Sequence, residues 1–290
     1  MSGISRVVLV DKPAGPTSFD IVRQARRGFQ GRVGHAGTLD PFATGLLVVL
    51  MGQATRLSQL FTHLPKEYEL TVQFGAVSST ADPMGEIVPT GQRVDRGAVH
   101  SALDGFLGKI IQKLPLTSAV KVDGEALYKR AHRGESIETP EREVMIYGLS
   151  LLDFDEQAQA ARILATTGSG TYLRVLAQDL GATLGVGGYA RELRRTRVGH
   201  FSVDEAVNLD GLSADLYQET GGGVLSLDEA LAFLPRVELA GREVSMAKNG
   251  NKLRSDREGR FRVYGDGRLL AVYQAEAREA RALVVFPGGV

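Results

Sequence analysis

One stretch of the chain joins a single carboxylate to residues that make a turn rigid. Residues 34–47 read GHAGTLDPFATGLL, so Asp40 is followed directly by Pro41 and has glycines on both sides. Proline fixes its own φ, and glycine allows a positive φ or the close approach of another backbone. A carboxylate on such a turn suits the role of a positioned nucleophile. Asp-Pro alone is also a common turn initiator, so the choice depends on the rest of the chain.

Cationic side chains gather near this stretch and again in a later segment. The total of 34 basic and 34 acidic residues gives no net charge, which by itself argues against a nucleic-acid partner. The distribution is uneven, because residues 201–235 hold acids and no Lys or Arg. The basic residues of the two segments are Arg23, Arg26, Arg27 and Arg32, then Arg191, Arg194, Arg195 and Arg197. We expect a basic face that binds phosphate, and a merely solvated charged face is the alternative.

Composition excludes several kinds of chemistry. The chain has no cysteine, which rules out disulfides, thiolate metal sites and a cysteine nucleophile. At 290 residues and 43% hydrophobic content, it is long enough for one large globular domain or two. The start MSGISRVVLVDKP lacks the apolar core of a signal peptide, and no run reaches membrane-spanning length. We therefore expect a cytoplasmic protein that does not enter membranes.

The hydrophobic pattern predicts the elements that hold these residues. Residues 67–74 alternate strictly, which predicts a strand with Tyr68 on its inward face. Thr17 or Ser18 is expected to cap a helix whose arginines point outward. Other expected strands are 6–10, 46–50, 118–122, 144–154, 160–166 and 191–198. Other expected helices are 55–64, 95–107, 125–132 and 171–184, with a loop at 78–89 and a linker at 221–223.

Four segments in this order and spacing resemble the TruB family of tRNA pseudouridine synthases. They are VDKP at 10–13, residues 34–47, KEY at 66–68 and GSGTYLR at 168–174. The similarity extends through SAVKVDG at 118–124 and RRTRVG at 194–199, and it covers most of the first 200 residues.

The resemblance implies a reaction, a fold and partners. The reaction is isomerisation of uridine 55 in the T loop of tRNA to pseudouridine, with the base detached from C1′, turned and rejoined through C5. It implies no metal and no cofactor, the tRNA T-arm as partner, no obligatory protein partner, and a monomer. The implied fold is α+β, the pseudouridine synthase fold: a mixed, largely antiparallel sheet with flanking helices and a central cleft.

The resemblance also assigns roles to residues. Asp40 matches the essential aspartate, Arg174 the arginine that pairs with it, and Tyr68 the tyrosine that stacks on the target base. His35 matches a histidine that fills the space of the extruded uridine. The remaining expected substrate-binding residues are Tyr172, which lines the pocket, Leu193, which packs under the active site, Lys12, which supports its floor, and Arg194, Arg195 and Arg197, which suit phosphate contacts. For Tyr68 and Tyr172 plain core packing is the alternative.

The domain division also follows from the resemblance and the linker. We expect a catalytic domain at 1–225, a thumb-like insertion at about 112–143, and a small β-rich PUA-like RNA-binding domain at 226–290. Alternative functions are a non-catalytic tRNA-binding or folding module and the catalytic subunit of a guide-RNA particle. A glycosidase would need a second carboxylate near Asp40, and Glu67 and Glu69 are expected on the strand face opposite Tyr68.

Overall fold

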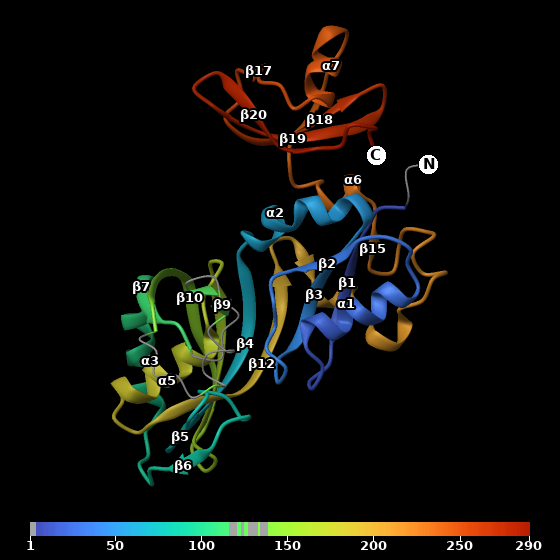
Figure 1. Ribbon diagram of the computed structural model, residues 1–290. Helices are drawn as coiled ribbons and strands as arrows, with labels where there is room; N and C mark the ends of the chain where they lie inside the picture. The colour runs from blue at the N-terminus through green and yellow to red at the C-terminus, as the bar shows by residue number, and fades with distance from the viewer. Residues whose placement is uncertain (1–3, 116–120, 123–124, 127–132, 134–138) are drawn as a thin grey trace.

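The structure is a computed structural model that describes residues 4–115, 121–122, 125–126, 133 and 139–290. Two separate twisted sheets carry the chain in that part, a large one with flanking helices and a smaller one at the C-terminal end (Figure 1). No helix in these ranges is long and apolar enough to cross a membrane.

The large sheet has eleven strands among the described residues. In hydrogen-bonded order its main path is β14 (Val207–Asn208), β1 (Arg6–Lys12), β3 (Thr44–Met51), β12 (Gly188–Val198), β4 (Lys66–Phe74), β11 (Ala160–Thr167), β10 (Glu141–Asp155) and β7 (Gly108–Lys113). Off this path are β2 (Val33–Ala36), β13 (Phe201–Ser202) and β15 (Val224–Leu225). Only the pairs β1–β14 and β12–β3 are parallel in the described sheet, which confirms the expected mixed, largely antiparallel arrangement.

Helix α1 (Ser18–Arg27) lies against β2 and shares a core with β1 and β3. Thr17 caps it in a capping box with Asp20, as the sequence predicts. The apolar face of the helix packs into a core with β1 and β3, while Arg23 is exposed. The Ser18 hydroxyl also exchanges two hydrogen bonds with the backbone of Leu39, at 3.1 and 2.9 Å. The start of α1 is therefore tied to the residue before Asp40.

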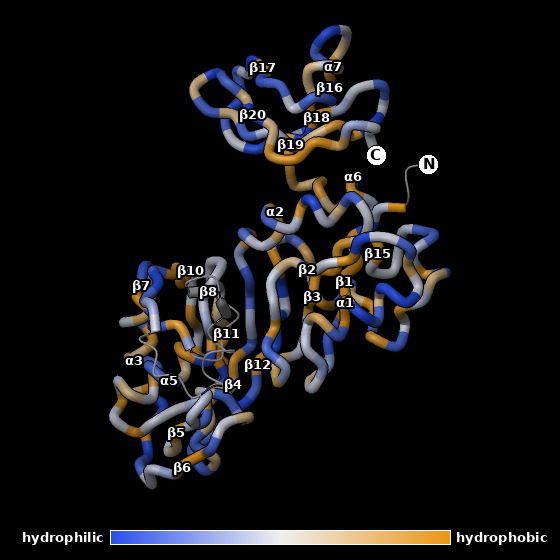
Figure 2. The backbone as a smooth tube through the Cα atoms, in the orientation of Figure 1, coloured by the Kyte–Doolittle hydropathy of each residue, from blue (hydrophilic) through white to orange (hydrophobic). Residues whose placement is uncertain are grey.

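Strand β4 lies in the centre of the sheet and has the predicted alternation. Tyr68, Leu70 and Phe74 are buried in a core with helix α5 (Leu173–Thr183), which packs on that face of the sheet. Strand β12 lies next to β4 and gives Leu193 to the same core. Strands β1 and β3 consist largely of hydrophobic residues, as the residue hydropathy drawn along the backbone shows (Figure 2).

Several expected elements differ in detail. The helix expected at 55–64 is a 3₁₀ turn (Gly52–Leu57) followed by α2 (Ser58–Thr62), and the one at 95–107 is α3 (Arg96–Leu103) followed by a 3₁₀ turn (Asp104–Phe106). The expected loop at 78–89 ends in paired short strands, β5 (Ala76–Ser78) and β6 (Ile87–Pro89). Two further 3₁₀ turns are Val203–Glu205 and Leu209–Gly211.

The expected insertion at 112–143 begins and ends on neighbouring strands. Its two ends pair antiparallel on β7 and β10, with Gln112 opposite Arg142. The expected helix at 125–132 is wrong at its start, because β9 (Glu125–Ala126) is a strand paired with β8 (Lys121–Val122). Most of the expected strand at 118–122 and the rest of that helix lie outside the described residues.

The smaller sheet has the order β16 (Arg236–Glu238), β18 (Gly259–Gly265), β19 (Arg268–Glu276), β20 (Glu279–Val285) and β17 (Leu253–Arg254), with α7 (Arg242–Lys248) packed beside it. Helix α6 (Leu227–Ala230) precedes it. Residues 221–223 differ from the expected linker, since the Gly223 carbonyl accepts a bond from Leu9 at 2.8 Å and β15 pairs with β1. They form a turn within the large sheet.

Candidate active site

Asp40 and Arg174 form an ion pair between the two halves of the large sheet. Asp40 lies on the turn between β2 and β3, and Arg174 lies in the first turn of α5. Their Oδ2 and Nε atoms are 3.3 Å apart. The arginine side chain is only 3% exposed and the aspartate side chain is 30% exposed, so the carboxylate is the partner that a ligand can reach. The pairing expected from the sequence is present, and Arg174 is buried.

Asp82 is a second carboxylate at this pair, and sequence reasoning missed it. Its Oδ2 is 3.3 Å from NH1 of Arg174, and its Oδ1 accepts bonds from Thr80 Oγ1 at 2.6 Å and the Met84 amide at 3.0 Å. Both oxygens are therefore engaged, and the side chain is 7% exposed. The only sequence signal was an Asp-Pro pair in a loop, as at Asp40. The carboxylate that a glycosidase would require is thus present but is bound to Arg174.

Burial dominates the electrostatics of Asp40. Loss of water raises the pKa of its carboxyl above the usual 3.8, Arg174 opposes this, Asp82 adds to it, and Lys12 opposes it. The two cations favour the ionised carboxylate, which is the form that a nucleophile requires. A pKa above that of a free aspartate also makes it more basic and hence a better nucleophile.

Lys12 braces the turn that carries Asp40. It is fully buried, and its Nζ donates to the carbonyls of Pro13, Pro41 and Ala43 at 2.9, 3.2 and 2.7 Å. Burial lowers its pKa to about 8, with Asp40 raising it and Arg195 lowering it. These contacts support the floor of the site, in line with the structural role expected for this lysine.

The structure corrects the expectation for Arg195. This side chain is 1% exposed and faces the interior, so it does not form part of a phosphate-binding surface. Its Nε donates to the Leu46 carbonyl at 2.7 Å and its NH2 donates to the Gly37 carbonyl at 2.9 Å. A Cβ on Gly45 would lie 2.3 Å from the Arg195 carbonyl oxygen, so only glycine fits there. Arg195 therefore holds the 34–47 stretch against β12.

His35 is half-buried on β2, where it pairs with Val49 of β3. It lies five residues before Asp40. Burial and the nearby Arg195 lower the pKa of its imidazole, which favours the neutral ring. Its Nδ1 is buried without a hydrogen-bond partner among the described residues. A neutral aromatic ring is the form that stacks best in an apolar gap.

Tyr68, Leu193 and Tyr172 come from three elements, β4, β12 and the N-terminus of α5. Tyr68 and Leu193 are 7% exposed and share one core cluster on neighbouring strands. Tyr172 is half-buried, and the guanidinium of Arg174 lies 5.8 Å from its ring centroid. The structure thus brings Tyr172 near Arg174, and it places Tyr68 and Leu193 in the core cluster that also holds Leu173, the residue before Arg174.

Arg194 lies on the other face of the sheet, where its guanidinium makes a two-point pair with Asp11 at 3.0 and 2.7 Å. The Arg194 side chain is still 41% exposed, so its expected phosphate contact stays a prediction. Arg197 is exposed.

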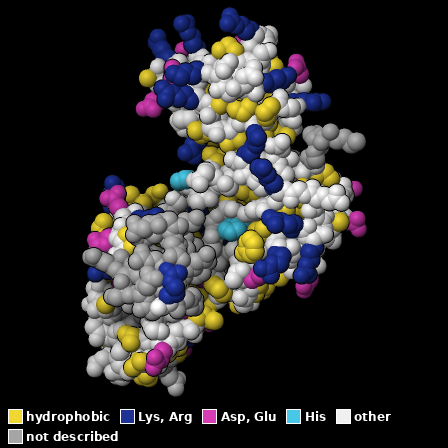
Figure 3. Space-filling model, in the orientation of Figure 1, with side chains coloured by type: hydrophobic (Ala, Val, Ile, Leu, Met, Phe, Trp, Pro, Cys, Tyr) yellow, Lys and Arg dark blue, Asp and Glu magenta, His cyan; other side chains and the backbone are white. Residues whose placement is uncertain are grey.

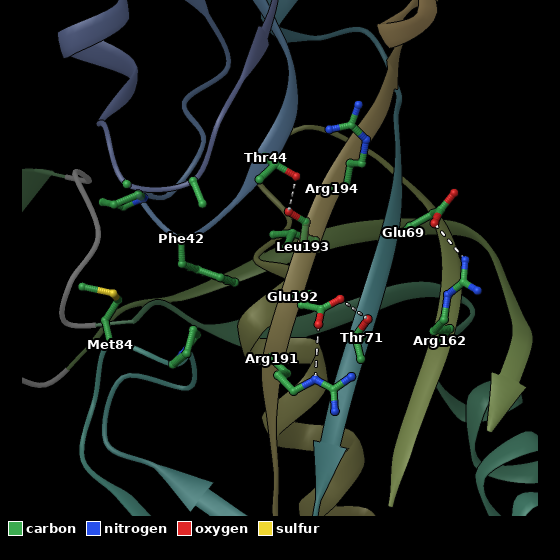
Figure 4. Close-up of a pocket in the computed structure, with 14 residues that line it drawn as sticks. Phe42, Thr44, Glu69, Thr71, Met84, Arg162, Arg191, Glu192, Leu193 and Arg194 are labelled. Carbon is green, nitrogen blue, oxygen red and sulfur yellow. Dashed lines mark hydrogen bonds and ion pairs between the residues drawn. The ribbon is translucent and has the colours of Figure 1, made fainter. Parts of the chain in front are cut away.

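A groove of about 760 Å³ runs along β4 and β12, and Leu193, Met84 and the two residues after Asp40, Pro41 and Phe42, also line it (Figure 4). Its walls include Thr71 and Glu69, which alternate along β4 with Leu70 and Tyr68. Arg162 pairs with Glu69 at 3.2 Å, and Arg191 contacts Glu192 at 3.5 Å. Because its cations are matched by acids and Asp40 does not line it, we place the chemistry at the Asp40–Arg174 pair and not in this groove.

The surface over α1 is rich in exposed positive charge, of which Arg23 is paired with Asp20 at 3.4 Å. Lys and Arg side chains gather over α1 in the space-filling view, with a histidine in the hollow beside them (Figure 3). Exposed arginines of this region are Arg23, Arg26, Arg27 and Arg32. Within the described ranges no group of three or more His, Asp or Glu side chains could hold a metal ion.

Two family models match consecutive parts of this chain. Residues 25–173 match the model of the TruB family pseudouridylate synthase N-terminal domain, and residues 174–232 match that of the tRNA pseudouridylate synthase B C-terminal domain. The tRNA pseudouridine synthase B of Thermobifida fusca is 40% identical over 97% of this chain and 98% of its own. That of Aquifex aeolicus is 37% identical over 91% and 93%.

Solved structures agree on the fold. The matching chain in the crystal structure of a Cbf5-Nop10-Gar1 complex has a TM-score of 0.72 and 25% identity, over 97% of this chain and 84% of that one. A chain of an H/ACA RNP bound to a substrate RNA containing 2′-deoxyuridine has a TM-score of 0.70 at 23% identity, with the same coverage. The family models and the relatives together show that this chain belongs to the TruB family of pseudouridylate synthases.

Proposed function

We propose that this protein converts uridine 55 in the T loop of tRNA to pseudouridine, alone and without guide RNA, metal or cofactor. The observation that carries the proposal is the reachable carboxylate of Asp40 held by the buried guanidinium of Arg174. Membership of the TruB family and relatives named tRNA pseudouridine synthase B support the substrate.

Asp40 supplies the chemistry. Its ionised carboxylate bonds to C1′ as the bond between C1′ and N1 of the base breaks. The detached uracil turns, and its C5 displaces the carboxylate from C1′, so that Asp40 is regenerated. C5 then loses its hydrogen as a proton and N1 gains a proton. Arg174 keeps the carboxylate charged and aimed. The overall change is an isomerisation, so it consumes no oxidant, reductant or second substrate.

The surrounding side chains hold the base. Tyr68 offers a ring for stacking and a phenol for proton transfer, and Leu193 and Tyr172 shape the pocket. The neutral ring of His35 fills the gap left by the flipped nucleotide, which recovers part of the unstacking cost of a few kcal/mol. Lys12 and Arg195 act through the turn they brace.

The T-arm is the RNA element that this surface suits. Exposed arginines on and after α1, together with Arg197, contact phosphates and position the RNA without reading its sequence. The division proposed from sequence places catalysis in residues 1–225, a thumb-like insertion at about 112–143, and a PUA-like RNA-binding domain at 226–290. The protein works in the cytoplasm as a monomer.

The test uses purified protein and an unmodified tRNA transcript labelled with tritium at C5 of uridine. Release of one tritium per tRNA, with no addition, is the expected result, since reattachment at C5 displaces that hydrogen. Asp40→Ala should bind the tRNA and release none. Dependence on an added metal, or activity in Asp40→Ala, contradicts the mechanism.

Two outcomes separate the alternatives. Conversion only after addition of a guide RNA indicates the subunit of a guide-RNA particle. Binding of tRNA without any conversion indicates a non-catalytic module. The joint presence of Asp40, Tyr68 and Arg174 on one face of the sheet favours the enzyme.

A further inference from the structure

Gln112 is a fully buried polar side chain that no step described above uses. It lies on the edge strand β7, between two exposed neighbours, Ile111 and Lys113. Burying an amide costs free energy unless its donors and its oxygen are bonded. Both ends of this amide have a partner, and the partner is the same residue.

The amide of Gln112 clamps the backbone of Tyr172. The Tyr172 N–H donates to Oε1 at 3.0 Å, and Nε2 donates to the Tyr172 carbonyl at 3.2 Å. That carbonyl also accepts the first helical bond of α5, from the Leu176 N–H at 3.1 Å. Gln112 therefore holds the residue at which α5 begins.

The start of α5 needs such support, because Tyr172 is its N-cap and its own side chain makes no capping bond. Arg174 follows two residues later and must reach Asp40 and Asp82 at once, each at 3.3 Å. A shift of the first turn by a few tenths of an ångström lengthens both contacts.

We infer that Gln112 is a positioning residue for the proposed reaction. By clamping the backbone of Tyr172 it sets the first turn of α5, and so holds the guanidinium of Arg174 against the carboxylate of Asp40. The inference rests on the proposed function for its kinetic consequence, but its structural consequence, the charge state of Asp40, is independent of turnover.

The experiment compares Gln112→Met with Gln159→Met in the full chain. Gln159 is a matched control, because it is also buried and clamps the backbone of Val94 by bonds of 2.7 and 3.2 Å, with a further bond from Nε2 to the Glu156 carbonyl at 2.8 Å. The titration of the Asp40 carboxyl is followed by ¹³C NMR, assigned by comparison with Asp40→Asn. Tritium release gives kcat and KM.

We expect Gln112→Met to move the Asp40 titration to higher pH, because Arg174 is the main group that opposes the effect of burial on it. We also expect kcat to fall by about tenfold with KM within about twofold. Gln159→Met should lose comparable resistance to urea and leave both readouts at wild-type values.

An unchanged Asp40 titration in Gln112→Met overturns the inference, even if kcat falls, since the loss then arises elsewhere. An equal shift in Gln159→Met also overturns it. If Gln112→Met does not fold, Gln112→Asn replaces it, because its amide is neutral and keeps donor and acceptor but is one methylene too short to span the Tyr172 N–H and carbonyl; the same shift is expected. Wild-type protein that forms no pseudouridine refutes the proposed function, and the NMR titration still decides the role of Gln112.

Discussion

Asp40 is poised by opposing effects at the level of single residues. Burial disfavours its charge, and so does the carboxylate of Asp82, whereas Arg174 and Lys12 favour it. Arg174 divides its guanidinium between two carboxylates, so Asp82 orients the cation while it also competes for it. Sequence reasoning identified Asp40 and Arg174 from their motifs. It could not identify Asp82, because nothing in a polar loop reveals which side chain the tertiary fold turns inward.

The raised pKa of Asp40 predicts opposite effects on activity and stability. Activity needs the ionised form and is lost as pH falls through a pKa above 3.8. A folded pKa above the unfolded one stabilises the protein at low pH, and this contribution is lost as pH rises through the folded pKa. At pH 7 Asp40→Asn should therefore abolish conversion while the free energy of unfolding in urea stays equal or rises by about 1 kcal/mol.

The matched control for this substitution is Asp153→Asn, because that side chain is 66% exposed and pairs only at 3.7 Å with Arg96. It should retain full activity and change the free energy of unfolding by less than about 0.5 kcal/mol. A loss of more than about 1 kcal/mol in Asp40→Asn, beyond the control, would mean that the carboxylate is a net stabiliser of Arg174.

At the scale of elements, the sequence predicted correctly those features of helices and strands that depend on neighbouring residues. The helix cap expected at Thr17 or Ser18 is Thr17, and the alternation around Tyr68 is confirmed, because each depends on neighbours in sequence. The β5–β6 pair was missed because its strands are three residues each and polar in part. The burial of Arg195 was missed because β12 alternates basic residues on both faces, and only its pairing with β3 shows which face is interior.

Two lysines under the 34–47 stretch predict an alkaline change in stability. Burial lowers the pKa values of Lys12 and Lys66 to about 8, and Arg195 contributes to both shifts. Lys66 is held by the carbonyls of Thr62 and Leu64, with no carboxylate partner among the described residues. When a lysine pKa is lower in the folded state, the unfolded chain binds more protons between pH 8 and 10, so stability rises over that interval.

The expected rise is roughly 1–2 kcal/mol for each lysine, measured by urea unfolding at pH 8, 9 and 10. Lys66→Met should flatten this dependence by about half, because one of the two titrating groups is then absent. Lys109→Met is the control, since its side chain is 65% exposed and lies on the edge strand β7. A wild-type curve that is flat or falls between pH 8 and 9 contradicts the prediction.

At the scale of the whole molecule, the charge total hid the features that matter. A net charge of zero is compatible with an RNA surface because the charge is unevenly spread: residues 201–235 hold acids and no Lys or Arg, whereas exposed arginines gather over α1. The sequence predicted the large sheet and a smaller β-rich domain, but it did not predict that the two sheets share one hydrophobic core. Residues of β1 and β3, such as Leu9 and Leu50, share one core cluster with Leu269 of β19 and with Phe286. A sequence pattern gives the buried face of a strand but not the distant element that covers it.

This shared core predicts that the two sheets unfold together. Phe286 is 1% exposed and lies just after β20, yet it packs in the cluster that contains Leu9. Phe286→Ala should lower the free energy of unfolding by about 3–5 kcal/mol. Hydrogen exchange followed by mass spectrometry should then show lost protection in β1 and β3 as well as in β19, because the cavity opens a core that belongs to both sheets.

Val263→Ala provides the comparison, because Val263 is fully buried in the separate core between the smaller sheet and α7. It should reduce protection mainly in β18, β19 and β20 and leave β1 nearly unchanged. If Phe286→Ala also leaves β1 protected, the sheets are independent folding units that merely touch. In that case the smaller sheet could contribute to RNA binding only through its own contacts with the RNA, and not by stabilising the large sheet. If β1 loses protection, the same sheet also supports the turn that carries Asp40, since β3 begins four residues after that aspartate.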